Sequence, residues 1–266
     1  MVSVFIFIFG LAIGSFLNAL IWRLHAGESI FKDRSHCPKC KHVLGFWDLF
    51  PILSFIIQKG KCRYCGKKIS WQYPLVELVT AVLFVVAYFI ISNFQFPISN
   101  KFLISNFQFL NLLRMWFVIA VMIVIFVYDL KYSLILDKVV YSAAVVAFLT
   151  SPLIYGEAGL GHSLSFAILS SAVGGGFFLL QYLLSSGKWI GGGDVKMGFL
   201  MGLILDIKGL LVALFFSYVI GALVGLGLIA AGKKTMKSQI PFGTFLAIGI
   251  IIAMFWGGEI LKWYLR

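Results

Sequence analysis

Charged residues are scarce in this sequence, and acids are scarcer than bases. Of 266 residues, 12% are charged and ten are Asp or Glu, whereas 61% are hydrophobic. A soluble globular domain carries about 25% charged residues, so the composition excludes an ordinary soluble protein. The mean hydropathy of +1.00 agrees with this conclusion. We therefore predict a polytopic membrane protein whose first partner is the lipid bilayer.

The sequence also lacks the features of a removable signal peptide. The first apolar run, residues 3–22, has no basic residue before it and no small-residue cleavage site after it, so we expect a retained first helix. The formal net charge of +12 would suit a nucleic-acid partner in a soluble protein. In a membrane protein the position of the basic residues sets the orientation instead, and we expect no nucleic-acid partner.

Eight apolar runs predict an all-α polytopic fold of about eight transmembrane helices. They are residues 3–22, 74–91, 112–128, 139–154, 163–184, 195–205, 210–231 and 242–256. The sixth run is well below the roughly 17 residues that a spanning helix needs, so full crossing by 195–206 stays open. The hexapeptide ISNFQF starts at residue 91 and again at residue 104, and we predict that residues 94–111 form a lengthened loop.

The distribution of basic residues predicts the orientation of these helices. If the loops alternate, 17 Lys and Arg lie on the side of residues 23–72, 129–138, 185–196 and 232–238, and five lie on the other side. The positive-inside rule places the richer side in the cytoplasm. We therefore expect both termini to be outside.

All four cysteines lie in one polar segment, residues 24–72, as the Cys-x-x-Cys pairs Cys37/Cys40 and Cys62/Cys65. Each pair presents two thiolates from one turn, and the spacing between the pairs is close to that of a zinc ribbon. Four thiolates leave no coordination position for water, so the predicted zinc is structural. Two disulfides are the alternative, which a reducing cytosol disfavours.

The stretch between the cysteine pairs, residues 44–55, is apolar but is interrupted by Asp48 and Pro51. It is too irregular to span a membrane. We expect it to lie against the membrane interface or beneath the zinc lobe.

Two aspartates stand at the edges of apolar runs. Asp129 ends the third run, and Asp194 follows three glycines just before the sixth run; the predicted topology places both at the cytoplasmic face. Two carboxylates within hydrogen-bond reach share one proton, so one can draw a proton from water while the other donates to a peptide carbonyl. We predict a catalytic dyad, with glycines that let backbone approach an extended substrate. The alternative for each aspartate is a helix cap.

A second tier of candidates consists of polar or glycine positions at the edges of apolar runs: Asn18, Glu77, Asp137, Gly193 and Lys196. Asn18 shares a helix face with Gly14, which indicates either helix packing with an amide hydrogen bond or substrate binding. Glu77 is either a helix N-terminal acid or part of a polar site. Asp137 is expected to be an N-cap.

Taken together, these motifs resemble the type IV prepilin leader peptidase family. The resemblance is carried, in chain order, by Gly14-Ser-Phe-Leu-Asn18, the two cysteine pairs, Tyr73-Pro-Leu-Val-Glu77, Asp129 with its link to Asp137, Gly191-Gly-Gly-Asp194-Val-Lys196 and Pro241-Phe-Gly243. It covers nearly the whole chain.

The resemblance implies a bacterial inner-membrane aspartic endopeptidase with Asp129 and Asp194 as its catalytic pair. Such an enzyme cuts the basic leader from type IV prepilins or type II secretion pseudopilins after a glycine, at the cytoplasmic face. The resemblance also implies N-methylation of the new N-terminus with S-adenosylmethionine, for which no Gly-x-Gly-x-x-Gly motif is present after a strand. One departure is the family's Ile-Pro-Asp, which reads Ile135-Leu136-Asp137 here.

We expect three domains: residues 1–23 as a first transmembrane helix, residues 24–72 as a cytoplasmic zinc-binding domain, and residues 73–266 as a membrane peptidase with its core at 112–231. Glu28, Asp48 and Glu77 are the acids expected to contact a basic leader. The alternative function is a non-enzymatic zinc-ribbon scaffold of a secretion or pilus machine. A proton-coupled transporter is disfavoured because no chain of acids crosses the bilayer.

Overall fold

The computed structural model describes residues 1–29, 34–93, 101–153, 160–235 and 238–265. Over these residues the regular structure is helical, with two isolated β-bridges and no strand. The predicted all-α class is therefore confirmed. Contacts divide the chain into two compact units, Met1–Pro97 and Ile98–Arg266, which are described one at a time.

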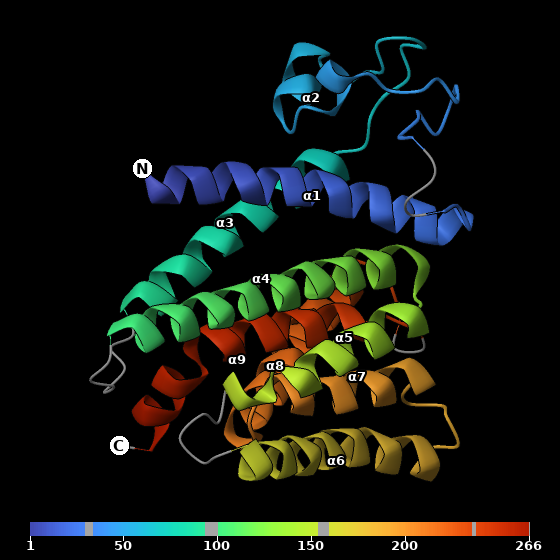
Figure 1. Ribbon diagram of the computed structural model, residues 1–266. Coiled ribbons are helices and arrows are strands. Elements are labelled where there is room, and N and C mark those ends of the chain that lie inside the picture. Colours follow the sequence, from blue (N-terminus) through green and yellow to red (C-terminus); the bar gives the residue numbers. More distant parts are fainter. Residues whose placement is uncertain (30–33, 94–100, 154–159, 236–237, 266) are drawn as a thin grey trace. The chain divides into compact units, whose positions relative to one another are not determined.

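The first unit contains two long apolar helices and a small lobe that lies between them in the chain. Helix α1 spans Val2–Ala26 and helix α3 spans Gln72–Asn93. The lobe holds the 3-10 turn η1, Phe46–Leu49, and the short helix α2, Leu53–Ile57. Helices α1 and α3 cross in contact with each other (Figure 1).

Two glycines of α1 allow this crossing. A Cβ built on Gly10 would lie 2.5 Å from Cα of Ala81, and one built on Gly14 would lie 2.6 Å from Cα of Glu77. Any side chain at either position would therefore push the helices apart. Small residues let membrane helices approach closely and gain van der Waals contact.

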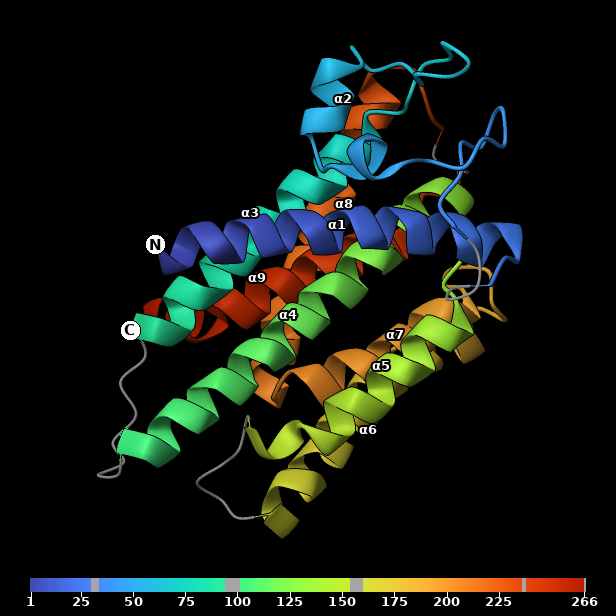
Figure 2. The same ribbon diagram turned by 45° about the horizontal axis from the view of Figure 1, so that its top comes forward.

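The second unit is a bundle of helices. Its elements are α4 (Lys101–Tyr132), α5 (Asp137–Leu149), η2 (Ser151–Leu153), α6 (Leu160–Leu184), α7 (Gly192–Ile204), α8 (Ile207–Ala230) and α9 (Phe242–Tyr264). Helix α7 packs against both α5 and α6 (Figure 2). Its residues Met197, Leu200 and Met201 are completely buried in the core.

Helices α6 and α7 meet through glycines. A Cβ built on Gly174 would collide with the carbonyl oxygen of Gly198, and one built on Gly202 would collide with that of Ser170. The two helices are therefore in close contact at Gly174. A Cβ on Gly176, by contrast, would meet no atom within 4 Å.

Six of the eight expected spans are long and apolar enough to cross a membrane: α1, α3, α4, α6, α8 and α9. The other two expected spans correspond to α5 and α7, which have 13 residues each. At about 1.5 Å per residue, 13 residues rise about 20 Å, which is less than the roughly 30 Å hydrocarbon core. The protein is thus a multi-pass membrane protein with two helices of sub-membrane length in its second unit.

Helix α7 ends inside the protein because a buried arginine satisfies its terminus. Arg114 of α4 donates from Nη2 to the carbonyl oxygen of Ile204 at 2.6 Å, and its exposed fraction is 7%. Carbonyls at a helix C-terminus need a donor and attract a cation. Arg114, which the topology prediction treated as a loop charge, is therefore part of the packed bundle.

The loop predicted for residues 94–111 is wrong over its second part. Helix α4 begins at Lys101 and runs without a break to Tyr132, so the second ISNFQF copy is helical, while residues 94–100 lie outside the described residues. The apolar pattern continues from Phe102 into the third run, and this continuity favours helix over loop.

The start of α5 yields a test. Leu136 precedes Asp137 with φ −76° and ψ 121°, and proline fixes φ at about −65 ± 15°. We expect Leu136→Pro to fold normally and to raise the thermal midpoint in detergent by a few degrees. Proline lowers the conformational entropy of the unfolded chain, and this stabilises the folded state by about 0.4–1 kcal/mol.

The control for this prediction is Val140→Pro, one turn further along. The backbone N–H of Val140 donates to the Leu136 carbonyl, so proline there loses a hydrogen bond and clashes, at a cost of about 3 kcal/mol. Equal destabilisation by both substitutions would contradict the proposed conformation of Leu136.

Candidate active site and metal centre

Asp129 lies in the last turn of α4 and is 4% exposed. Its Oδ2 accepts hydrogen bonds from the backbone N–H of Thr244 at 2.8 Å and from Thr244 Oγ1 at 3.2 Å. Thr244 belongs to the first turn of α9. The carboxylate of Asp129 is thus held at the N-terminus of another helix, where free N–H groups and the helix dipole favour an anion.

Asp194 is the third residue of α7 and is 8% exposed. Its Oδ2 accepts from the backbone N–H of Gly191 at 3.1 Å, as in a capping box. Both aspartates therefore occupy helix N-termini, Asp194 that of its own helix and Asp129 that of α9. Helix capping was the alternative to catalysis for each aspartate. In the structure both aspartates accept hydrogen bonds at helix N-termini, so they have capping contacts within the candidate site.

Ile135 brings the surroundings of the two aspartates together. A Cβ on Gly193, next to Asp194, would lie 3.1 Å from Cβ of Ile135. A Cβ on Gly243 would lie 2.8 Å from Cδ1 of Ile135 and 3.0 Å from Oδ2 of Asp129. The charge of Asp129 also acts on Asp194. Glycines beside two acids that are far apart in the sequence thus pack on the same isoleucine, so the two acids belong to one region of the bundle.

The three glycines before Asp194 have backbone conformations that any residue can adopt. Gly191 has φ −79°, and Gly192 and Gly193 are the first two residues of α7, so none of the three uses the left-handed region. Gly193 is needed for space, because Ile135 packs against it. A Cβ built on Gly192 would meet no atom within 4 Å, so this side of its backbone is open to an approaching chain.

Asp137 and Lys196 form an ion pair between α5 and α7. Lys196 Nζ lies 2.6 Å from Asp137 Oδ1, and the same ammonium lies 5.8 Å from the ring centroid of Tyr141. Asp137 is the first residue of α5, after Leu136 at the cap position, where no side-chain cap is formed. The N-cap predicted for Asp137 is therefore replaced by a contact with the residue two positions after Asp194.

The four cysteines form a cluster that could hold a metal ion. Their sulfur atoms all lie within 4.8 Å of one another, and all four are free thiols. Burial raises the pKa of the Cys37 thiol, but hydrogen bonds from Cys40 and Lys39 outweigh it and lower the pKa to about 7. A thiolate is the form that binds metal. The predicted tetracysteine site is thus assembled.

The two cysteine pairs are built as matching turns. Lys41 N–H donates to the Cys37 carbonyl, and Gly66 N–H donates to the Cys62 carbonyl, both at 2.9 Å. The residue after each second cysteine has positive φ, 60° at Lys41 and 68° at Gly66. Each turn is closed by one isolated bridge. The two turns therefore have the same backbone structure, and each presents two of the four cysteine side chains.

The acids of the first unit serve its architecture. Asp48 accepts from Gly45 N–H, Gln58 Nε2 and Tyr64 OH, and its Oδ1 lies 3.5 Å from Arg63 Nε. Asp48 therefore ties the turn that begins at Gly45 to the second cysteine turn, and these contacts leave it poorly placed to meet a basic leader.

Glu77 is a buried acid of α3 that holds the lobe. Its Oε2 accepts from the backbone N–H of Ile52 at 2.7 Å. Ile52 has φ 59°, an unusual value for a β-branched residue. Glu77 thus stabilises a strained turn, which favours a structural role over a site shared with substrate.

Asn18 does what its packing interpretation predicts. Its Nδ2 donates to the carbonyl of Tyr73 at 3.0 Å, and its Oδ1 accepts from Gln72 Nε2 at 3.2 Å. Asn18 is 2% exposed. These bonds join α1 to the first turn of α3, and they occupy the amide that a substrate would otherwise use.

Sequence reasoning missed Thr244 and Ile135. Thr244 follows the motif Pro241-Phe-Gly243, and a hydroxyl residue in the first turn of an apolar helix was an available signal. Ile135 is one apolar residue among many, and no local pattern distinguishes it. Its importance comes from the helices that converge on it.

Comparisons with known proteins agree on one family. A model described as "Bacterial Peptidase A24 N-terminal domain" matches residues 8–91, and one described as "Type IV leader peptidase family" matches residues 116–226. A protein from Bacillus subtilis (strain 168) is 36% identical over 98% of this chain and 97% of its own length. A Legionella pneumophila protein is 31% identical over 97% of this chain and 92% of its own.

A third relative, from Aeromonas hydrophila, is 31% identical over 98% of this chain and 92% of its own length. All three relatives carry the name "Prepilin leader peptidase/N-methyltransferase". No solved structure gives a significant match.

The cysteine cluster predicts a metal stoichiometry. We expect the purified full chain to carry about one divalent metal ion, measured by elemental mass spectrometry, and Cys62→Ser to lose most of it because three thiolates no longer close a tetrahedron. His42→Gln is the matched control, since His42 neighbours the first pair but is not in the cluster. Metal retention by Cys62→Ser together with loss in His42→Gln would contradict the ligand set.

Proposed function

The chain belongs to the type IV leader peptidase family, and we propose that it is a membrane aspartic endopeptidase with Asp129 and Asp194 as its catalytic pair. Its substrates are type IV prepilins or type II secretion pseudopilins, cut after a glycine. The observation that carries the proposal is that two buried carboxylates, each held at a helix N-terminus, stand beside glycines that pack on the same residue, Ile135.

The proposed chemistry follows from that arrangement. Two nearby carboxylates cannot both ionise easily, so the pair holds one proton. The hydrogen bonds from Thr244 and Gly191 all end on Oδ2 atoms, so we assign the Oδ1 atoms to the reaction. The charged Oδ1 draws a proton from water, the protonated Oδ1 donates to the peptide carbonyl, and the water oxygen attacks the carbonyl carbon to form a tetrahedral gem-diol. The carboxyl that took the proton from water then gives it to the amide nitrogen, the C–N bond breaks, and the other carboxylate takes back a proton from the gem-diol hydroxyl, so the pair again holds one proton.

The membrane setting suits this substrate. In the proposed topology α5 and α7 also carry the chain across the membrane, packed within the bundle, in addition to the six long helices. Both termini then lie on the outer side of the bacterial inner membrane, and both aspartates lie at the cytoplasmic face. A pilin precursor is an apolar helix whose basic leader stays at that interface. A dyad at this depth reaches the scissile bond while the helix remains in lipid.

We assign zinc to the four-cysteine cluster, in a structural role. The sulfur separations suit tetrahedral coordination with Zn–S distances of about 2.3 Å. Four thiolates leave no open position for water, so the metal takes no part in hydrolysis. We accordingly divide the chain into a first helix at 1–23, a zinc domain at 24–72 and a peptidase domain at 73–266.

A second activity, N-methylation of the new N-terminus, is proposed from the names of the relatives. S-adenosylmethionine would supply the methyl group as a sulfonium cation. The first unit has a groove between its small lobe and the start of α3, and this groove is lined by Lys59, Lys61 and Lys68, which repel such a cation. That groove therefore does not fit the methyl donor.

The dyad is tested against plain helix capping by one comparison. We expect Asp129→Asn and Asp194→Asn each to lower prepilin cleavage by at least about 10²-fold, because asparagine can cap but cannot exchange a proton. Asp206→Asn is the matched control, since Asp206 caps α8 by accepting from Gly209 N–H and asparagine caps equally well. Cleavage is followed by mass spectrometry of the prepilin in detergent.

The same variants discriminate against the alternative of a non-enzymatic scaffold. If the aspartates only cap helices, all three asparagine variants will behave alike. Full cleavage by Asp129→Asn or Asp194→Asn, with metal content and thermal midpoint unchanged, rejects the dyad.

The close packing at Gly243 gives a second test. An added Cβ would displace Ile135 or Asp129, and misplacement of a catalytic group by about 1 Å costs roughly 10²-fold in rate. We expect Gly243→Ala to reduce the cleavage rate by about that factor. Gly258→Ala, in the same helix, should leave the rate within about twofold, because a Cβ there meets nothing within 4 Å. Unchanged cleavage in Gly243→Ala would mean that Asp129 needs no fixed position.

A further inference from the structure

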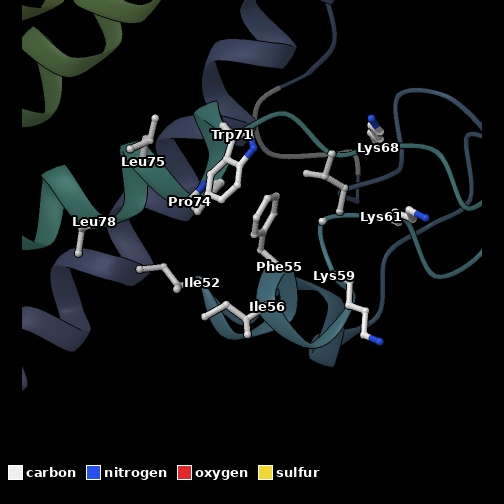
Figure 3. Close-up of a pocket in the computed structure, with 12 residues that line it drawn as sticks. Ile52, Phe55, Ile56, Lys59, Lys61, Lys68, Trp71, Pro74, Leu75 and Leu78 are labelled. Atoms are coloured by element: carbon white, nitrogen blue, oxygen red, sulfur yellow. The ribbon is translucent and has the colours of Figure 1, made fainter.

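A groove of about 710 Å³ lies in the first unit, where the lobe meets the start of α3 (Figure 3). Ile52, Phe55 and Ile56 line it from the lobe, and Leu75 and Leu78 line it from α3. Its volume is in the range of ligand sites, about 300–1,000 Å³. The mechanism proposed above uses none of its residues.

One end of the groove is cationic. Lys59, Lys61 and Lys68 line it, and Figure 3 shows them along one side with their ammonium groups pointing outward, while Ile52, Leu75 and Leu78 lie on the other side. Lys61 and Lys68 are bridge partners. No acid is among the lining residues, and the salt bridges formed within the described ranges involve none of the three lysines. This end therefore offers three positive charges to an anion.

The other end is continuous with the apolar surface of a membrane helix. Leu75, Leu78, Val79 and Val82 are exposed by 54%, 42%, 45% and 46%. Their spacing of three to four residues places them on one stripe of α3. A hydrocarbon chain in the groove would therefore continue along this stripe without meeting polar backbone.

The groove has a fixed frame. Glu77 holds Ile52 through the backbone bond described above. The rings of Phe55 and Trp71 lie between the two ends, with centroids 5.0 Å apart. Gly60 packs on Phe55, since a Cβ there would lie 3.2 Å from that ring. Trp71 is 70% exposed, as is common for tryptophan at a membrane interface.

We propose that this groove is a binding site for one anionic phospholipid. The phosphate lies among Lys59, Lys61 and Lys68, and an acyl chain runs past Phe55 onto Leu75 and Leu78. Basic pockets beside membrane helices recognise anionic head groups in this way. The lipid would hold the metal-binding lobe against the bilayer. The proposal does not depend on peptidase activity.

Charge complementarity favours this occupant over two others. The sulfonium of S-adenosylmethionine and the basic leader of a prepilin both carry positive charge, which three lysines repel. A phospholipid alone combines an anionic head with a chain long enough to reach the lipid-facing stripe.

The test is native mass spectrometry of the full chain in neutral detergent. Phosphatidylglycerol and phosphatidylcholine with identical acyl chains are added in equal amounts. A lysine near an anionic head group contributes roughly fivefold in affinity, and solvent screening reduces the total, so we expect a preference for phosphatidylglycerol on the order of tenfold. The triple variant Lys59→Gln/Lys61→Gln/Lys68→Gln should reduce this preference to within about twofold.

Two control variants define the site. Lys39→Gln/Lys67→Gln/Lys233→Gln removes the same charge from exposed lysines that do not line the groove, and it should keep the preference. Lys59→Arg/Lys61→Arg/Lys68→Arg keeps the charge and should keep it too. The metal content and thermal midpoint of each variant show that the lobe is folded.

Several outcomes would overturn the proposal. These are equal binding of the two lipids by the unmodified chain, an equal loss of preference in the control triple, or an unchanged preference in the groove triple. If the groove triple instead loses affinity for a prepilin peptide while lipid selectivity is unaltered, the groove is a peptide site and the lipid assignment is wrong.

Discussion

The second unit depends on satisfying two carboxylates in an environment that is mostly hydrocarbon. A buried carboxylate is costly unless hydrogen-bond donors meet it. Asp129 obtains its donors from the N-terminus of α9 and Asp194 from the N-terminus of α7. The ends of α4, α7 and α9 must therefore converge, and this requirement fixes where each helix begins. The proposed active site is a consequence of where backbone N–H groups are available.

The rest of the bundle supports this convergence. Gly243 and Gly193 leave room for Ile135, which packs against both glycines. Glycines on α6 and α7 bring those helices into backbone contact, and Arg114 closes α7 at its far end. Because α7 is fixed at both ends and on its α6 face, Asp194 has little freedom to move. Catalysis by positioned groups needs such restraint.

Sequence reasoning predicted the features that local chemistry determines and missed those that depend on packing. Hydropathy identifies the long helices, and cysteine spacing identifies the cluster, since both signals lie within short segments. The helical start of α4 at Lys101 was missed because the near-repeat of a hexapeptide favoured a lengthened loop, although the apolar pattern continues through the second copy. Thr244 and Ile135 act only through helices distant in sequence, and Arg114 is buried only because α7 ends beside it. Whether Asp129 and Asp194 react with substrate stays a prediction.

The scarcity of acids makes their partners informative. Among the acids of the described ranges, Asp48 is paired with Arg63 and Asp137 with Lys196, Glu28 Oε1 lies 3.6 Å from His36 Nε2, Asp206 caps α8, and Glu259 is exposed. A cation partner favours the charged carboxylate and so opposes proton uptake. Asp129 and Asp194 are buried without such a cation and lie near each other, whereas Glu77, also buried, has no second acid among its contacts. The two aspartates are therefore the acids whose surroundings permit one proton to be held and exchanged.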